Sequence, residues 1–182
     1  MVRYCSCKIL LEAWYDKNRL FFKNASEWIM RNSLEQHLRS SLRGDVEIRP
    51  EQVVDEGNPV DIKVTWQFSN RLALIEIKWL GKSKNSEDQI TAKYYDKRAR
   101  EGAEQLADYL ERNKPRASVH ITRGYLVIID GRRYRMSDDA EAINQINGFY
   151  YENREVEFDP KFHEVRRDFE PPIRMFVEPI CR

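Results

Sequence analysis

The chain has 182 residues, of which 41% are hydrophobic and 34% are charged, and its formal net charge is +1 at pH 7. This length and composition suit one domain with a hydrophobic core and a heavily charged surface. The balanced charge argues against a protein that coats nucleic acid through a global basic field, but it permits a local basic cleft. No apolar run reaches membrane-spanning length and no signal peptide pattern opens the chain, so we expect no membrane association.

The cysteine count and the absence of several sequence motifs limit the cellular compartment and the classes of catalysis to be considered. Three cysteines, Cys5, Cys7 and Cys181, cannot all close into disulfides, which favours a reducing cytoplasm. The histidines are scattered without metal-ligand spacing. Neither a Gly-rich phosphate loop nor a serine nucleophile elbow is present, so the sequence gives no support to nucleotide-driven or acyl-transfer chemistry.

The first long element is a helix predicted over residues 26–43, after an apolar segment that ends at Phe22 and that we interpret as a further helix. Asn24 or Ser26 can cap its start. The apolar face of this predicted helix is marked by Trp28, Leu34, Leu38 and Leu42.

An acidic residue, Glu35, falls near the middle of that apolar face when the chain turns by about 100° per residue. A glutamate there is costly to bury unless it meets a metal or a cation. Two interpretations are open. Glu35 either points at a metal site, or it pairs with Arg31 or Arg39 on its own helix.

A strand at about residues 45–49 and a hairpin of strands 60–68 and 72–80 are predicted next. The first hairpin strand alternates, with Val60 and Ile62 on one face and Asp61 on the other. On the second strand, Glu76 and Lys78 are two residues apart and therefore share a face.

Two carboxylates and a lysine in the middle of an apolar sheet require compensation. A divalent metal held by Asp61 and Glu76 would provide it, and Lys78 could then orient a metal-bound water. This is the equipment for hydrolysing a phosphodiester. The alternative is a surface hairpin with ordinary cross-strand charge pairs.

The rest of the chain is predicted to contain a polar loop over residues 81–91 at the mouth of this site and a helix from about 94 to 112. The helix carries an apolar stripe, with Gln105 and Tyr109 one turn apart beside it. A buried strand is predicted at 124–130, a helix at 138–150, and short strands near 155–158 and 173–177.

The spacing from Pro59-Val60-Asp61 to Glu76-Ile77-Lys78 resembles the PD-(D/E)xK nuclease superfamily, although the proline is displaced by one residue. Gln105 and Tyr109 resemble the Gln-x-x-x-Tyr helix motif of its RecB-like branch. The resemblance covers about residues 26–130 and implies an α/β fold with the restriction-endonuclease-like αβββαβ core, a mixed central sheet flanked by helices. We expect one nuclease-like domain over 1–182, with peripheral additions at both ends.

The resemblance also implies site residues. Asp61, Glu76 and Lys78 would be catalytic, and Mg²⁺ or Mn²⁺ would be held by Asp61, Glu76, the backbone of Ile77 and, by position only, Glu35. Gln105 and Tyr109 would contact the substrate, and we add Arg98 from the basic cluster at 93–100. Some RecB-like relatives bind an iron–sulfur cluster through four cysteines. This chain has three cysteines and no Cys-x-x-Cys, so we expect no such cluster.

The function predicted from these residues is a Mg²⁺- or Mn²⁺-dependent deoxyribonuclease, acting in DNA-end processing, restriction or antiviral defence. The alternative is a non-catalytic module of the same fold that binds DNA or protein within a larger complex. Unassigned apolar segments at both ends, such as Ile9-Leu10-Leu11, are compatible with a partner protein or a homodimer.

Overall fold

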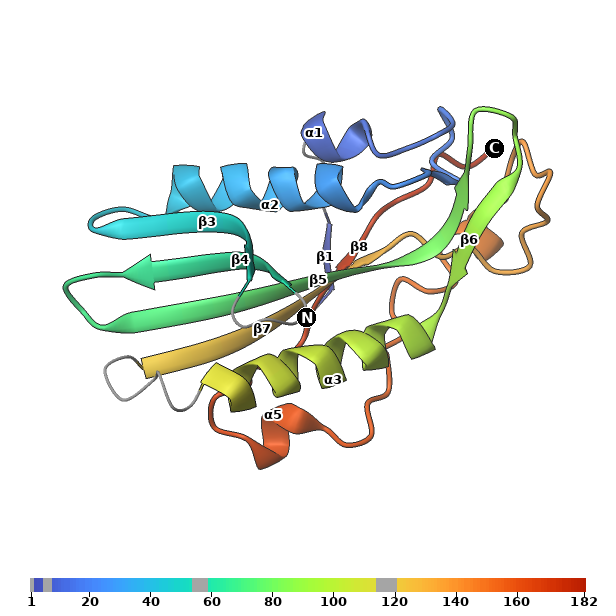
Figure 1. The fold of residues 1–182 in the computed structure, drawn as a ribbon. Helices are drawn as coiled ribbons and strands as arrows, with labels where there is room; N and C mark the ends of the chain where they lie inside the picture. The colour runs from blue at the N-terminus through green and yellow to red at the C-terminus, as the bar shows by residue number, and fades with distance from the viewer. Residues whose placement is uncertain (1, 5–7, 54–58, 114–120) are drawn as a thin grey trace.

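The computed structural model describes residues 2–4, 8–53, 59–113 and 121–182, and Figure 1 shows a sheet lying between helices. The strands form one mixed sheet in the order β1-β8-β7-β5-β4-β3, and β2 and β6 also pair with β5. The expected α/β class and mixed central sheet are confirmed. The elements are β1 (Val2–Tyr4), α1 (Lys8–Leu11), β2 (Phe22–Lys23), α2 (Glu27–Ser41), β3 (Val46–Val53), β4 (Pro59–Trp66), β5 (Arg71–Lys84), β6 (Ile90–Tyr94), α3 (Asp96–Asn113), β7 (Ile121–Asp130), α4 (Gln145–Gly148), α5 (Phe162–Val165) and β8 (Ile173–Phe176).

Strand β5 is the centre of the sheet. It pairs antiparallel with β4 and parallel with β7, and nearly all its residues are buried. Its side chains alternate between two cores. Ile75 and Ile77 belong to a core on the side of α2, and Leu74 and Leu80 belong to a second core on the side of α3. A strand covered on both faces can therefore bring any polar residue it carries into the interior.

Helix α3 covers one face of the sheet with the apolar stripe predicted from the sequence (Figure 1). Ala99, Ala103, Leu106 and Leu110 are all buried in the core between α3 and the sheet. Leu106 is fully buried, as expected for a residue in the middle of the stripe. The spacing of small and large apolar residues therefore fixed the face of this helix correctly.

Helix α2 covers the opposite face, but its predicted orientation was wrong in part. Ile29 and Met30 are buried, and Leu34 and Leu38 pack at the edge of the same core. Trp28, which was expected on the apolar face, is 54% exposed. The helix is therefore rotated toward Ile29 and Met30, which moves the centre of its buried face away from the position inferred from Trp28.

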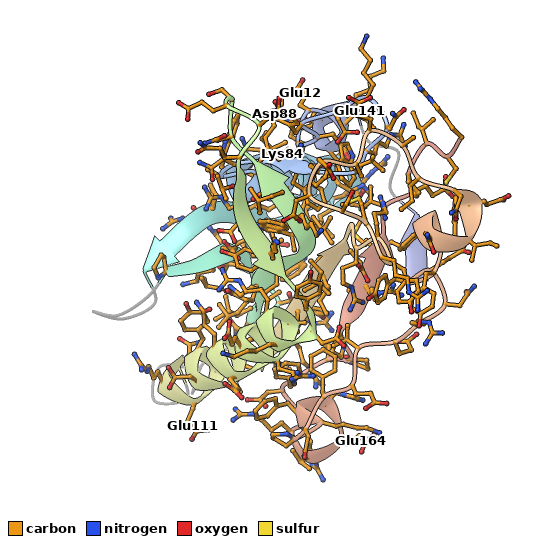
Figure 2. All side chains as sticks on the ribbon, turned by 90° about the vertical axis from the view of Figure 1, so that its right-hand side faces the viewer. Glu12, Lys84, Asp88, Glu111, Glu141 and Glu164 are labelled. Atoms are coloured by element: carbon orange, nitrogen blue, oxygen red, sulfur yellow. The ribbon has the colours of Figure 1, made fainter. Side chains whose placement is uncertain are left out.

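The segment 81–91, predicted as a polar loop, instead extends the sheet. Strand β5 continues to Lys84 and forms an antiparallel hairpin with β6. The polar residues of this hairpin have partners, because Lys82 Nζ donates to Met136 O and Lys84 Nζ lies 4.4 Å from the centre of the Phe21 ring. Figure 2 shows Lys84 and Asp88 at this hairpin, on the opposite side of the molecule from Glu111 on α3.

The two ends of the chain are less regular than predicted. Within 138–150 only α4, from Gln145 to Gly148, is helical, and its first turn is capped by the Asn144 side chain, which accepts from Asn147 N at 2.9 Å. No strand forms at 155–158, whereas the strand predicted at 173–177 is β8. The N-terminal apolar segment forms the short α1 followed by turns and β2.

Strand β3 also runs past Pro50, where the prediction ended it. It continues to Val53, because β3 lies at the end of the strand order and an edge strand tolerates a residue without a backbone N–H. In the described part of the chain, no helix is both long and apolar enough to span a bilayer.

Candidate active site

Asp61 lies where β4 separates from β5. The backbone pairing of the two strands ends at Ile62 and Ile75, and one residue further along β4 the Asp61 carboxylate accepts the backbone N–H of Ile77 at 2.8 Å. Val60 packs in the core on the α3 side, whereas Ile62 packs on the α2 side. The predicted alternation, with Val60 and Ile62 on one face, is therefore wrong at Asp61. At this point the Asp61 side chain, in place of a β4 carbonyl, accepts the β5 backbone N–H of Ile77.

Glu76 and Lys78 lie on β5 with Leu74 and Leu80 as the apolar residues of the same face. Both polar residues are buried, Glu76 at 1% exposure and Lys78 at 6%. Lys78 Nζ donates to Glu76 Oε1 at 2.5 Å. The other carboxylate oxygen, Glu76 Oε2, is buried and accepts no hydrogen bond from the described residues. An acceptor of this kind is costly unless a further group reaches it.

Burial raises the pKa of Glu76 to about 7, against the attraction of Lys78 and with additional repulsion from Asp61. The pKa of Asp61 is also raised, again mainly by burial, and is held back by the Ile77 N–H, Lys78 and Arg31. The charge of Asp61 thus disfavours the ionised form of Glu76. A cation at this place would relieve both the desolvation and the repulsion.

Gly102 on α3 makes the room that Lys78 needs. A Cβ built at Gly102 would lie 2.5 Å from Lys78 Cγ and 3.0 Å from Lys78 Cε. Real Cβ contacts are not this short, so any side chain at this position would have to displace the lysine stem. The glycine therefore lets helix and strand approach closely while a long cationic side chain passes between them.

The predicted helix pair Gln105 and Tyr109 reaches the start of β4. Gln105 Nε2 donates to the Tyr109 hydroxyl, which in turn donates to Pro59 O at 3.0 Å. The pKa of Tyr109 is raised by burial and then by the charges of Glu76 and Asp61, against the Gln105 hydrogen bond. The structure thus brings these two residues to the same place as Asp61. Tyr109 is only 3% exposed, and its hydrogen bond to Pro59 O holds the start of the β4 backbone in position.

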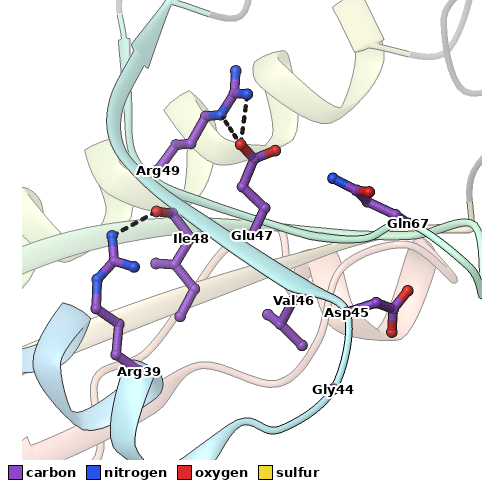
Figure 3. A pocket seen from close by; sticks show the side chains of 8 residues that line it. All are labelled: Arg39, Gly44, Asp45, Val46, Glu47, Ile48, Arg49 and Gln67. Carbon is purple, nitrogen blue, oxygen red and sulfur yellow. Dashed lines mark hydrogen bonds and ion pairs between the residues drawn. The ribbon is translucent and has the colours of Figure 1, made fainter.

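Glu35 is taken up by its own helix, as the alternative interpretation had it. Its carboxylate accepts from Arg39 Nε at 2.8 Å, and Arg39 Nη2 also donates to Ile48 O at 2.8 Å. Figure 3 shows this contact between Arg39 and Ile48 in the open pocket beside β3. Glu35 is thereby held in an ion pair with Arg39, one turn further along the same helix. The expectation that Glu35 points at the metal site is not met.

The acidic residue of α2 that does approach the carboxylates is Glu27, two turns earlier. Its charge raises the pKa of both Asp61 and Glu76. Glu27 Oε1 accepts from Arg98 Nη2 of α3 at 3.2 Å, and Arg31 Nη1 lies 3.9 Å from Asp61 Oδ1. Sequence reasoning missed Glu27, because an acid in a first helical turn has a sufficient explanation in the helix dipole.

The residues present fit a hard divalent cation that needs only one or two carboxylate ligands from the protein. Among the described residues, no three His, Cys, Asp or Glu side chains group to hold a metal. Mg²⁺ nevertheless commonly binds proteins through one or two carboxylates and completes its shell with water and substrate phosphate. The donors here would be an oxygen of Asp61 and Glu76 Oε2, which has no hydrogen-bond partner among the described residues. Ile77 would contribute its backbone only, since its side chain is buried in the α2-side core.

The remaining expectations concern cysteines. Cys181 is a free thiol, and burial raises its pKa against the nearby charge of Arg133. Cys5 and Cys7 lie outside the described residues.

Comparisons with known proteins add no further assignment. No protein-family model, no curated protein and no solved structure matches this chain.

The raised pKa of Glu76 predicts a stability change with pH in buffer containing EDTA. Between pH 4.5, the ordinary value for this carboxyl, and about 7, the unfolded chain has released a proton that the folded chain still holds. Stability from this group therefore falls as the pH rises through that window. We expect the stability of Glu76→Gln relative to wild type to improve by about 2–3 kcal/mol between pH 5 and pH 8, measured by urea unfolding. A difference independent of pH would contradict the shift.

The close approach of Gly102 to Lys78 predicts that Gly102→Ala destabilises the protein, although alanine is favoured over glycine in a helix by about 1 kcal/mol. The clash with the fixed lysine stem should outweigh that gain and cost about 1–3 kcal/mol in urea unfolding. Glu104→Ala, at an exposed position of the same helix, should change stability by at most about 0.5 kcal/mol. A stabilised Gly102→Ala protein would contradict this packing.

Proposed function

We propose that the chain is a divalent-metal-dependent deoxyribonuclease with a restriction-endonuclease-like core. The order α2, β3, β4, β5, α3, β7 supports this proposal, because it follows the αβββαβ sequence of that core with β6 added between β5 and α3. The observation that carries the proposal is the buried Glu76. One of its carboxylate oxygens is paired with Lys78, and the other accepts no hydrogen bond within the part of the chain that the structure describes.

The roles follow from the contacts. Asp61 and Glu76 would hold the cation, and the chemistry that a bound Mg²⁺ or Mn²⁺ supplies is polarisation of the phosphodiester and a lowered pKa of water. Lys78, fixed on Glu76, would place its ammonium group where charge develops on the scissile phosphate. The Ile77 N–H fixes the Asp61 carboxylate through a hydrogen bond of 2.8 Å.

Substrate contacts are assigned to the side of the site formed by α3. The Arg98 side chain is 29% exposed and lies over the ring of Tyr94, and its guanidinium forms ion pairs with Glu27 and Glu101. A phosphate would compete with these partly exposed carboxylates for the guanidinium. Gln105 is partly exposed, and its amide can contact the strand. Tyr109 acts as a positioning residue through Gln105 and Pro59, since its hydroxyl is already committed.

Cleavage of labelled DNA in Mg²⁺ or Mn²⁺ tests this proposal. We expect Lys78→Met to lower kcat by about 10²–10³-fold, because it removes a preorganised cation from the transition state. Glu76→Gln should remove measurable activity with the loss of a metal donor.

The matched control for the lysine is Lys82→Met. Lys82 is on the same strand, but it binds Asp138 at 2.7 Å and Met136 in the β5–β6 hairpin region. It should retain wild-type cleavage once its folding is verified. Equal activity in wild type, Glu76→Gln and Lys78→Met would reject the nuclease proposal.

Cation binding separates the two glutamates of α2. We expect Mn²⁺ to raise the melting temperature of wild type, and Glu27→Gln to weaken Mn²⁺ binding by about tenfold, as loss of an outer charge does at metal sites. Glu35→Gln should bind Mn²⁺ like wild type, because Glu35 is paired with Arg39. Thermal unfolding measures the melting temperature, and calorimetric titration measures Mn²⁺ binding by wild type, Glu27→Gln and Glu35→Gln.

The same titration decides between the enzyme and the binding module. Asp61→Asn should lose the Mn²⁺ response. If wild type itself binds no Mn²⁺, the non-catalytic module of this fold becomes the better description. If Glu35→Gln weakens binding and Glu27→Gln does not, our assignment of Glu27 is wrong.

A further inference from the structure

A second cavity opens at the N-terminal end of α3, outside the site described above. Its volume is about 290 Å³, near the lower end of the range for small-ligand pockets. Its lining combines three tyrosines with three arginines, Tyr134, Tyr150, Tyr151, Arg100, Arg132 and Arg154. Rings and guanidinium planes are the groups on which unpaired nucleic acid bases stack.

One wall of the cavity is a rigid cation. Arg132 is 4% exposed, and its guanidinium donates to both oxygens of the fully buried Asp130, at 2.9 and 2.7 Å, and to Asp96. It also lies 4.3 Å from the centre of the Tyr151 ring. Arg174 donates to the same Asp130 at 2.6 Å. This network is built at the end of β7 and fixes the wall before any ligand arrives.

The other wall is a stack that ends at an exposed guanidinium. The rings of Tyr134 and Tyr150 are stacked with their centroids 3.9 Å apart and an angle of 14°. The guanidinium of Arg154 lies 3.9 Å from the Tyr150 centroid and forms the pocket-side end of the stack. Arg135 lies over Tyr134 at 5.1 Å and does not line the cavity. A base can extend this stack at Arg154.

The charges of the lining suit a nucleotide more than a bare phosphate. Asp96, which also lines the cavity, is occupied by Arg132. Glu155 and Glu157 at the cavity oppose a phosphate, but their carboxylates can accept hydrogen bonds from the amino groups of a base. Arg100 donates to the Glu157 carbonyl across a long contact of 3.4 Å, so its guanidinium can turn to a backbone phosphate.

We propose that this cavity binds an unpaired nucleotide of the DNA strand that enters the active site, which makes single-stranded DNA or a frayed end the substrate. This inference rests on the proposed nuclease function. Arg100 is two residues before Gly102, the residue packed on Lys78, so the cavity and the active site lie on two sides of one helix. The path between them bends round the start of α3, over about 10 Å of helix diameter.

Strand flexibility explains the selectivity. A duplex has a persistence length of about 150 base pairs and does not bend round one helix end at low cost. A single strand can do so, and the N-terminus of α3 offers a positive dipole to the phosphates on the way. The cavity, with its stacking wall, then holds the base of a nucleotide about one helix diameter from the cleavage point.

The test is fluorescence anisotropy of a labelled single-stranded oligonucleotide and of a blunt duplex of the same sequence, in EDTA so that no cleavage occurs. We expect wild type to prefer the single strand. Arg154→Gln and Tyr150→Leu should weaken single-strand binding by about tenfold, because base stacking on planar side chains is lost.

The matched control is Arg135→Gln, which removes the same charge from the opposite, solvent-exposed end of the same stack. It should keep the wild-type Kd within about twofold. Arg154 is exposed, so Arg154→Gln is not expected to disturb folding, and its result stands even if Tyr150→Leu unfolds.

Each other result would overturn the inference. Equal losses in Arg154→Gln and Arg135→Gln would show a nonspecific charge effect, and no loss in Arg154→Gln would exclude the cavity. Undetectable single-strand binding, or equal weakening of duplex and single strand, would exclude the substrate class. These binding measurements need no metal, so their outcome does not depend on the outcome of the cleavage assay. A failure of the cavity proposal and a failure of the nuclease proposal can therefore be told apart.

Discussion

The buried pair of Glu76 and Lys78 constrains everything around it. An ion pair 1% and 6% exposed loses hydration that its own attraction does not easily repay, so it is a weak source of stability. The surrounding structure is adapted to keep it. Gly102 leaves space for the lysine stem, and the Ile77 N–H holds the Asp61 carboxylate through a hydrogen bond where β4 separates from β5. The desolvation free energy of such a pair is largest in a central strand that is buried on both faces. A functional role therefore explains its presence better than a contribution to stability does.

The sequence predicted this part of the fold well, because the relevant patterns are local. The stripe through Ala99 and Leu106 set the face of α3, and the two-residue spacing of Glu76 and Lys78 set their common side. Glu35 could not be settled in the same way. Periodicity gives the rotation of a helix only when its apolar residues are all buried, and Trp28 is not. The position of α2 along the sheet, which brings Glu27 to the site, depends on packing that no local pattern encodes.

Polar segments were predicted worst, and for one physical reason. The β5–β6 hairpin was expected to be a loop because Lys82 and Lys84 gave it no apolar alternation, yet both lysines have partners elsewhere in the chain. The tyrosine–arginine cavity was invisible for the same reason. Tyr134 and Tyr150 are not neighbours in the sequence, and only the fold shows that their rings stack on each other. A polar residue is predicted to be in solvent until its partner is known, and the partner is a property of the fold.

The contrast between buried and exposed ion pairs suggests how the site would work with a substrate. Glu27 and Arg98 are 52% and 29% exposed, and pairs of this kind contribute about 0–1 kcal/mol. A phosphate can therefore compete for Arg98 at little cost, and the competition would return the Glu27 charge to the carboxylates beside it. Glu76 and Lys78 cannot exchange partners in this way, because separation would leave two buried charges. In the proposed nuclease, the buried Glu76–Lys78 pair would mark the cleavage point. A phosphate bound at Arg98 would release the Glu27 charge, which favours a cation at Asp61 and Glu76.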